Sequence, residues 1–142
     1  MDNTDIKILK ILQNNCKATL KDIGAAVNLT SPAVMERIRK MTDSKVIEGY
    51  YTSINFEKFG MTITALISVD VNQKKYESFC NFCREEELII THHHIIGPYN
   101  AMLHVIARDS AELSKLLNKL NFFGTTQTSI ILDTLFSNEI LK

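Results

Sequence analysis

The sequence of 142 residues has no long apolar run and no net charge. A membrane-spanning helix needs about 20 consecutive, mostly apolar residues, and no stretch comes near that length. The opening residues, MDNTDIKILK, also lack the basic start and unbroken apolar stretch of a secretory signal peptide. We therefore expect a cytoplasmic protein with no membrane partner.

Cysteine is scarce, and the familiar catalytic motifs are missing. The chain has three cysteines, Cys16, Cys80 and Cys83. Three cysteines are too few for a disulfide framework and cannot all form pairs, so we expect reduced thiols. Cys80 and Cys83 could be half a zinc site, but an apolar helical stripe also explains their spacing, and we favour the core. No Walker loop, GxGxxG motif or nucleophile–base constellation is present. The sequence therefore predicts neither an enzyme nor a protein with a cofactor or metal.

Charge is divided unevenly between the two parts of the chain. Residues 1–60 contain nine Lys or Arg and seven Asp or Glu (+2), whereas residues 61–142 contain seven and nine (−2). The N-terminal excess has the sign that DNA binding requires, but it is small. Affinity for DNA would have to come from a local cationic face and from several copies of that face in an oligomer.

Three capping signals, each followed by apolar residues at helical spacing, predict three helices in the first 60 residues. The signals are Asp2 with Asp5, Thr19 with Asp22, and Thr30 or Ser31 ahead of Pro32. The second helix is short, and Asn28 and Leu29 separate it from the third. A short helix, a tight turn and a third helix are typical of a helix-turn-helix.

The third predicted helix has one apolar and one polar face. Val34, Ile38 and Met41 recur at i, i+4 and i+7, so they face inward together. At about 100° per residue, the outward residues are Pro32, Met35, Glu36, Arg39 and Lys40. Most polar helix faces are in contact only with water, and periodicity alone would favour that interpretation here. The helix-turn-helix context is what favours DNA.

The outward face offers groups that the major groove can bind. Arg39 and Lys40 can reach base acceptors or phosphates, and Glu36 can accept a hydrogen bond from a cytosine amino group. Arg37 lies at the edge of the apolar stripe, so we interpret it as a tether of the helix or a phosphate contact. The predicted DNA-binding residues are Thr30, Ser31, Pro32, Met35, Glu36, Arg37, Arg39, Lys40 and Lys45.

Residues 46–56, VIEGYYTSINF, predict a two-stranded wing directly after the third helix. The segment places β-branched and aromatic residues around Gly49. A wing in this place would brace the helix, and Lys45, Tyr51 and Lys58 are candidate contacts to the DNA backbone.

Beyond residue 60 the pattern is that of a second domain. MTITALISVDV alternates strictly, as a half-buried strand should, and residues 74–87 switch to helical spacing. Residues 88–96 and 99–107 are β-rich and joined by a Gly-Pro turn, which favours a hairpin. Asp109 begins a second helix, and residues 125–136 form the last strand.

The order β-α-β-β-α-β predicts a ferredoxin-like domain, in which two helices cover one face of a four-stranded antiparallel sheet. The other face would leave Leu66 and its neighbours exposed, which favours a second subunit there. The predicted fold class is thus α+β. It combines a winged helix-turn-helix in residues 1–60 with a ferredoxin-like oligomerisation domain in residues 61–142.

His92, His93 and His94 raise the question of a metal site. On a strand, His92 and His94 share one face and His93 takes the other, so the three cannot converge. Zinc would need further ligands, such as His104 across the hairpin from His93. We favour packing or subunit contact, in which these groups could be sensitive to pH.

Four stretches resemble the Lrp/AsnC, or feast/famine, transcriptional regulators, and the resemblance covers essentially the whole chain. They are DIKIL, LTSPAVMERIRKM, VIEGYYTSINFEKFG and IIGPYNAML. The most specific matches are Leu29 with Thr30, Arg37 with Ile38, Ile47 with Gly49 and Tyr50, and Gly97 with Tyr99.

This resemblance implies sequence-specific binding of double-stranded DNA by the N-terminal domain. It also implies that the C-terminal domain forms a homodimer, assembles into octamers or similar rings, and senses small amino acids between dimers. The implied effector-binding residues are Gly97, Tyr99, Asn100, Met102, Thr126 and Thr128.

Two residues depart from the family pattern. Lys45 stands where glycine is usual, at a cost of about 1 kcal/mol if the position is left-handed. Asn100 stands where the family usually has an aspartate, whose charge would suit the ammonium group of an amino acid. An amide can hydrogen-bond an ammonium but brings no charge. The hypothesis is therefore weak binding of an amino acid, a different ligand, or none.

Two other functions remain open at the level of sequence. Siroheme decarboxylases share this two-domain architecture and use histidine and arginine against a tetrapyrrole, and the histidines at 92–94 lie close in sequence to Tyr99 and Asn100. An effector-sensing oligomer that does not bind DNA is the other. The reading that we adopt is a DNA-binding transcriptional regulator of the Lrp/AsnC type.

Overall fold

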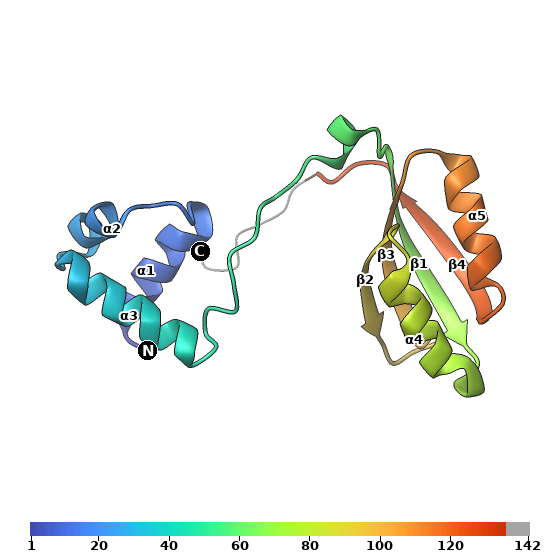
Figure 1. Ribbon diagram of the computed structural model, residues 1–142, viewed down its shortest axis with the longest axis horizontal. Coiled ribbons are helices and arrows are strands. Elements are labelled where there is room, and N and C mark those ends of the chain that lie inside the picture. The colour runs from blue at the N-terminus through green and yellow to red at the C-terminus, as the bar shows by residue number, and fades with distance from the viewer. Residues whose placement is uncertain (136–142) are drawn as a thin grey trace. The chain divides into compact units, whose positions relative to one another are not determined.

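The computed structural model describes residues 1–135 (Figure 1). Among them are two compact units, residues 1–53 and 54–135. The division falls before the predicted junction at residue 60, because the 3-10 helix η1 (Phe56–Phe59) leads directly into the first strand. Residues 136–142, which include the end of the predicted last strand, lie outside the described residues. Within residues 1–135, no helix is both long and apolar enough to cross a membrane.

The N-terminal unit consists of the three predicted helices, α1 (Asn3–Asn14), α2 (Leu20–Val27) and α3 (Ser31–Asp43). At each start, a side-chain oxygen accepts a hydrogen bond from a backbone N–H three residues ahead. The pairs are Asp2 with Asp5, Thr19 with Asp22, and Thr30 with Ala33. Such caps satisfy amide groups that have no partner inside the helix, so the helices begin where the sequence predicts.

The three helices share one apolar core. Its buried members are Ile8, Leu12, Ile23, Val34, Met41 and Ile47. Val34 and Met41 come from the predicted inward face of α3, and the partly buried Ile38 packs against the same core. Burial of apolar surface contributes about 25 cal/mol per Å². This core therefore fixes α3 against α1 and α2.

The predicted two-stranded wing is wrong for the described chain, in which residues 46–55 form no strand. Ile47 is buried in the helical core, and its backbone N–H donates to the carbonyl of Met41 at 3.0 Å. Every residue from 48 to 55 is exposed. An isolated two-stranded ribbon is at best marginally stable, so this segment gains too little burial to form one.

The C-terminal unit is the predicted ferredoxin-like fold. Its strands are β1 (Ile63–Val71), β2 (Ile89–His94), β3 (Ala101–Ala107) and β4 (Gly124–Ile131). Its helices are η1, η2 (Gln73–Lys75), α4 (Tyr76–Glu85) and α5 (Ser110–Leu120). The strand order is β2-β3-β1-β4 and all pairs are antiparallel, with α4 and α5 on one face (Figure 1).

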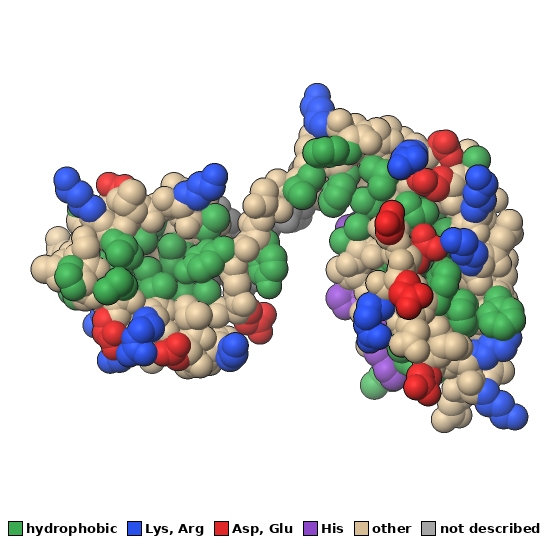
Figure 2. All heavy atoms as spheres, viewed as in Figure 1, with side chains coloured by type: hydrophobic (Ala, Val, Ile, Leu, Met, Phe, Trp, Pro, Cys, Tyr) green, Lys and Arg blue, Asp and Glu red, His purple; other side chains and the backbone are tan. Residues whose placement is uncertain are grey.

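Alternate side chains of β1 lie on opposite faces of the sheet. Ala65, Ile67, Val69 and Val71 are buried, and the last three join the core beneath α4 and α5. Leu66 lies on the other face, opposite His104 of β3 and Ser129 of β4, and it is 36% exposed. Figure 2 shows acidic and basic side chains interspersed over the solvent side of the two helices.

The last strand is shorter than predicted. β4 ends at Ile131, which pairs with Thr64 near the start of β1. Residues 132–135 are exposed and belong to no strand. Because β1 offers few residues beyond Thr64, residues 132–135 have no described neighbour with which to continue the ladder.

The histidines pack as their alternation predicts. His92 and His94 lie opposite the core residues Leu103 and Ala101, and His93 lies opposite Met102 on the open face. The His92 ring centroid is 5.1 Å from that of Phe79. Within residues 1–135, no group of three or more His, Cys, Asp or Glu side chains could hold a metal ion. The packing interpretation is confirmed for His92.

The cysteines also follow the helical stripe of α4. Cys83 is buried in the core, where desolvation raises the pKa of its thiol to about 12. Cys80 is partly buried on the same helix, and Cys16 is exposed. A thiol with so high a pKa stays protonated at neutral pH and is a poor nucleophile or ligand. The core interpretation of Cys83 is thus confirmed.

Candidate nucleic-acid interface

The turn between α2 and α3 is tight because Gly24 lets two backbone segments meet. The N–H of Leu29 donates to the carbonyl of Gly24 at 2.9 Å. A Cβ atom at residue 24 would lie only 2.4 Å from the carbonyl oxygen of Leu29. Asn28 takes the left-handed conformation, with φ of 56°, which asparagine tolerates better than most residues. Only residues 28–30 therefore separate α2 from α3, as a helix-turn-helix requires.

The structure places the outward face of α3 as predicted. Val34 is fully buried, whereas Met35 is 56% exposed. The exposed residues of α3 are the predicted Pro32, Met35, Glu36, Arg39 and Lys40, together with Thr42 and Asp43. The other predicted DNA-binding residues, Thr30, Ser31, Arg37 and Lys45, lie on α3 or directly beside its ends. All nine therefore belong to one surface element.

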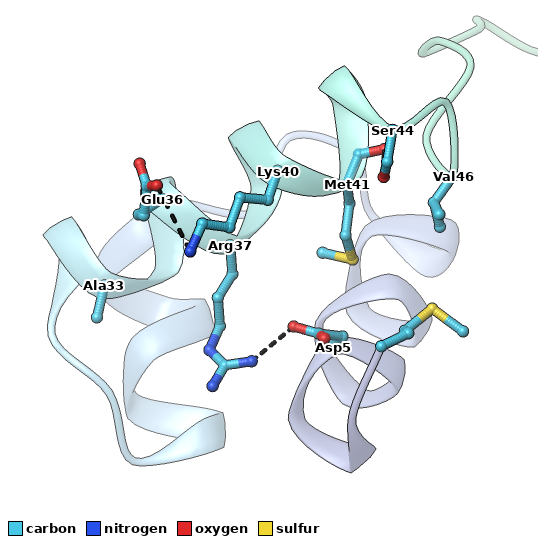
Figure 3. Close-up of a pocket in the computed structure, with 9 residues that line it drawn as sticks. Asp5, Ala33, Glu36, Arg37, Lys40, Met41, Ser44 and Val46 are labelled. Carbon is cyan, nitrogen blue, oxygen red and sulfur yellow. Dashed lines mark hydrogen bonds and ion pairs between the residues drawn. The ribbon is translucent and has the colours of Figure 1, made fainter.

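Arg37 ties α3 to the start of α1. One of its terminal nitrogens lies 2.8 Å from Asp2 Oδ2 and 2.7 Å from Asp5 Oδ1, and Figure 3 shows the side chain reaching toward Asp5. The same carboxylates form the capping box of α1. The backbone N–H of Asp5, followed by Arg37, lowers the pKa of Asp2 below its usual value. Of the two roles predicted for Arg37, the tether is therefore confirmed.

Arg39 is held by two carboxylates on its own helix. Its Nε and one terminal nitrogen donate to Glu36 at 2.9 and 2.8 Å, and its other terminal nitrogen donates to Asp43 Oδ2 at 2.7 Å. Lys40 Nζ lies 3.8 Å from Glu36 Oε1, and the dashed line in Figure 3 marks this ion pair. The hydrogen bond from Arg39 lowers the pKa of Glu36. The outer face of α3 is thus a network of paired charges.

The sequence prediction missed Asp43 as a member of this network. The signal was available, because Asp43 follows Arg39 by four residues and Glu36 precedes it by three, which are the spacings at which helical side chains meet. Lys45 takes φ of 60°, so the position is left-handed and the predicted backbone cost applies.

A hollow of about 540 Å³ lies beside α3, between its Arg37 side and the start of α1. Asp5, Arg37, Lys40 and Val46 are among its lining residues (Figure 3). The Arg37–Asp5 ion pair crosses this hollow. We therefore interpret the hollow as part of the contact between α3 and α1, and not as a ligand site.

The predicted effector residues begin at the turn between β2 and β3. Asn100 Oδ1 accepts from the backbone N–H of Val71, and Asn100 Nδ2 donates to its carbonyl, both at 2.8 Å. The Tyr99 hydroxyl is 2.9 Å from Gln127 Oε1. Gly97 is exposed in the same turn. The amide of Asn100 therefore extends the backbone pairing at the end of β1.

The remaining effector residues do not meet in one chain. Met102 lies opposite Ser68 on the open face of the sheet. Thr126 and Thr128 lie opposite Val69 and Ile67, on the face that α4 and α5 cover. Within one chain the sheet thus separates Met102 from the two threonines, and the six predicted residues do not line a single pocket.

Two protein families match the chain. The AsnC-type helix-turn-helix domain matches residues 1–42, and the Lrp/AsnC ligand binding domain matches residues 64–141. Each match covers one of the two units described above. Regulators of this kind bind DNA and small-molecule effectors and form oligomers.

Individual relatives agree with this assignment. The chain is 31% identical over 134 residues to the uncharacterized HTH-type transcriptional regulator YezC of Bacillus subtilis, covering 94% of this chain and 95% of YezC. It is also 31% identical to the HTH-type transcriptional regulator FL11 of Pyrococcus horikoshii, with 94% and 91% covered.

Among solved structures, the fold is similar to that of B. subtilis LrpC, with a TM-score of 0.92, 22% identity, and 97% and 99% of the two chains covered. These relatives do not favour the tetrapyrrole-enzyme alternative. The chain belongs to the Lrp/AsnC family of HTH-type transcriptional regulators, and it is a regulator of transcription rather than an enzyme.

Proposed function

We propose that α3 lies in the major groove of duplex DNA and reads it with Arg39 and Lys40, with Glu36 beside them on the same face. The observation that supports this proposal is that α3 has two distinct faces. Val34 and Met41 are buried on one face, and the polar residues of the other face are exposed to solvent. A helix anchored in this way presents a rigid surface to base edges. Thr30, Ser31 and Lys45 lie at its two ends, where they would contact phosphates.

Each copy of this face brings little net positive charge. Glu36 and Asp43 pair with Arg39, and Arg37 is paired with Asp2 and Asp5. Non-specific affinity for DNA depends on the number of phosphates that cations neutralise. We therefore propose that two copies bind together on one operator, with the N-terminal unit binding DNA in the cytoplasm.

The open face of the sheet supports dimerisation of the C-terminal unit. Leu66, Met102 and Ile131 lie on this face, and Leu66 remains 36% exposed in one chain. A second copy of the same face would cover it, as a two-fold interface does. We propose that such dimers assemble further into octamers or similar rings.

The C-terminal unit would also bind the effector at the turn that contains Gly97, Tyr99 and Asn100. A structure related in fold, from Neisseria meningitidis, is the regulator NMB0573 in complex with L-Met. It has a TM-score of 0.92 and 21% identity, covering 100% of this chain and 96% of that one. We propose a small amino-acid-like effector for this chain, bound weakly because the amide of Asn100 is neutral and already pairs with Val71.

Fluorescence anisotropy tests the DNA proposal. The protein is titrated onto duplex DNA from upstream of its own gene and onto scrambled duplex, across a series of salt concentrations. We expect preference for the upstream DNA, and an affinity that falls steeply with salt. The double variant Arg39→Ala with Lys40→Ala should lose the preference for the upstream duplex, together with affinity and part of the salt slope.

Lys74→Ala with Lys115→Ala is the matched control, because it removes the same charge from the C-terminal unit. Equal, weak binding of both duplexes, unchanged by the α3 variant, would contradict the proposal and favour an effector-sensing oligomer that does not bind DNA.

Calorimetry with the twenty amino acids tests the effector proposal. Tight binding of a simple amino acid by the natural protein would contradict it. We expect Asn100→Asp to raise affinity for the ammonium group, at a loss of about 1–3 kcal/mol of stability, because the Val71 carbonyl loses its donor. Asn118→Asp, on the exposed side of α5, is the matched control, which should leave effector affinity unchanged and cost less than about 1 kcal/mol of stability.

A further inference from the structure

The guanidinium group of Arg39 is fixed from two sides in the absence of DNA. Glu36 binds it through two hydrogen bonds of 2.8 and 2.9 Å, and Asp43 through one of 2.7 Å. The Arg39 side chain is 58% exposed, so solvent and ligands reach it freely. Of the five N–H donors of a guanidinium, these contacts use three, and two remain for a ligand.

The two carboxylates occupy different parts of the guanidinium. Glu36 takes the edge formed by Nε and its neighbouring terminal nitrogen, which is a bidentate arrangement. Asp43 holds only the far nitrogen, through a single bond. The edge between the two terminal nitrogens is the one that matches guanine O6 and N7. A guanine that approached Arg39 at this edge would therefore leave both Glu36 bonds in place and share the far nitrogen with Asp43.

The carboxylate of Asp43 does not stabilise the end of α3. It is the last residue of α3, where the negative end of the helix dipole disfavours a carboxylate. Its described side-chain contact is the bond to Arg39. Exposed ion pairs of this kind are weak, so a base or a phosphate can replace the carboxylate.

We propose that Arg39 is the guanine-reading residue of α3, that Glu36 is the positioning residue that fixes its orientation, and that Asp43 is a counter-charge that suppresses non-specific DNA binding. This inference rests on the proposed binding of DNA by α3. Its physical basis is that a pre-oriented side chain loses less entropy on binding, while Asp43 repels phosphates that would attract a free arginine at any sequence.

A pool of duplexes with randomised central base pairs provides the test, with sequencing of the bound fraction and anisotropy on the unselected pool. Each variant is made in the full chain and checked for an unchanged melting temperature. Arg39→Lys keeps the positive charge but loses the planar guanidinium, whose paired N–H donors can bind two acceptors at once. We expect it to lose guanine preference at one position of each half-site by about tenfold and to keep the salt slope of the natural protein.

The two carboxylates should respond differently to removal of charge. Asp43→Asn should raise affinity for the unselected pool and make the salt slope steeper by about 1, since it releases one cation for phosphate contact. Glu36→Gln should weaken the guanine preference as well. Glu48→Gln removes a carboxylate from the same unit outside α3 and should change neither property.

The outcomes separate the two proposals. A natural protein that enriches no sequence overturns both. If the natural protein enriches a sequence while Arg39→Lys and Glu36→Gln retain the same guanine position, or if Asp43→Asn binds the pool no better than Glu48→Gln, then the inference fails and the proposed function stands.

Discussion

At the scale of single residues, Gly24 determines how closely α2 and α3 can approach. Glycine in the interior of a helix costs about 1 kcal/mol relative to alanine. Alanine at this position would nevertheless place a Cβ atom 2.4 Å from the Leu29 carbonyl oxygen, which belongs to the backbone and cannot rotate away. The clash outweighs the gain in helix propensity, so this glycine is a requirement of the turn.

We expect Gly24→Ala to lower the free energy of unfolding of the N-terminal unit by about 1–3 kcal/mol, because the turn must shift to admit the new methyl group. Thermal melting followed by circular dichroism measures the loss. Gly49→Ala is the matched control, since its Cβ would meet only the mobile side chain of Tyr51, at 3.0 Å. That variant should stay within about 0.5 kcal/mol of the natural protein. Equal stability of the two variants would show that the turn can relax.

At the scale of elements, two contacts make the packing of helices and strands depend on pH. The ion pairs of Arg37 connect α3 to α1 through Asp2 and Asp5. The ring of His92 packs β2 against α4 beside Phe79. The first contact needs ionised carboxylates, whereas the second needs a neutral imidazole. The two contacts therefore weaken in different ranges of pH.

The pKa of Asp2 and that of Asp5 are lowered below 3.8, first by backbone hydrogen bonds and then by Arg37. A depressed folded-state pKa adds stability that is fully present above the unfolded value and is lost as the pH falls through the folded value. We expect helical circular dichroism of the natural protein to decline below pH 3.8 more steeply than that of Arg37→Ala. Parallel titrations of the two proteins would show that the tether contributes nothing.

Burial, followed by the charges of His94 and His93, lowers the pKa of His92 below 6.5. Its Nε2 atom is buried and has no hydrogen-bond partner among the described residues. Because the unfolded chain takes up the proton first, stability is full above pH 6.5 and falls as the pH drops toward the folded pKa.

Melting temperatures at pH about 5 and about 8 test this expectation. His92→Phe should show a smaller difference between the two values than the natural protein. His93→Gln changes a residue on the open face and should show the same difference in melting temperature as the natural protein. A natural protein whose melting temperature does not change between these values would contradict the prediction.

At the scale of the whole molecule, one chain leaves both proposed activities incomplete. The outer face of α3 carries little net charge, and the sheet separates Met102 from Thr126 and Thr128. The open sheet face also retains apolar side chains that one chain does not cover. Each of these features is resolved by association of copies, which supports the oligomer proposed above.

We expect Leu66→Asp to dissociate the dimer, because it places a carboxylate in the centre of the open face, opposite His104 and Ser129. Light scattering after size-exclusion chromatography gives the mass of the particle, and DNA affinity should fall with it. Ser114→Asp, on the exposed side of α5, introduces the same charge away from this face and should leave the mass unchanged. A dimer that survives Leu66→Asp would place the interface elsewhere.

The sequence by itself determined the three N-terminal helices, the βαββαβ order and the outward face of α3. These features depend on capping signals and on periodicities of 3.6 and 2 residues, which act over a few positions. The family matches, Leu29 with Thr30 and Gly97 with Tyr99, also lie within such short stretches.

Only the tertiary structure decided that the described residues 46–55 form no wing, that β4 ends at Ile131, and which partners Arg37 and Asn100 have. Ribbon formation and strand length depend on what a segment can bury and with which strand it can pair. Arg37 meets Asp5 across 32 positions of sequence, and Asn100 meets Val71 across 29. No local pattern encodes such contacts, because they exist only once the elements have packed.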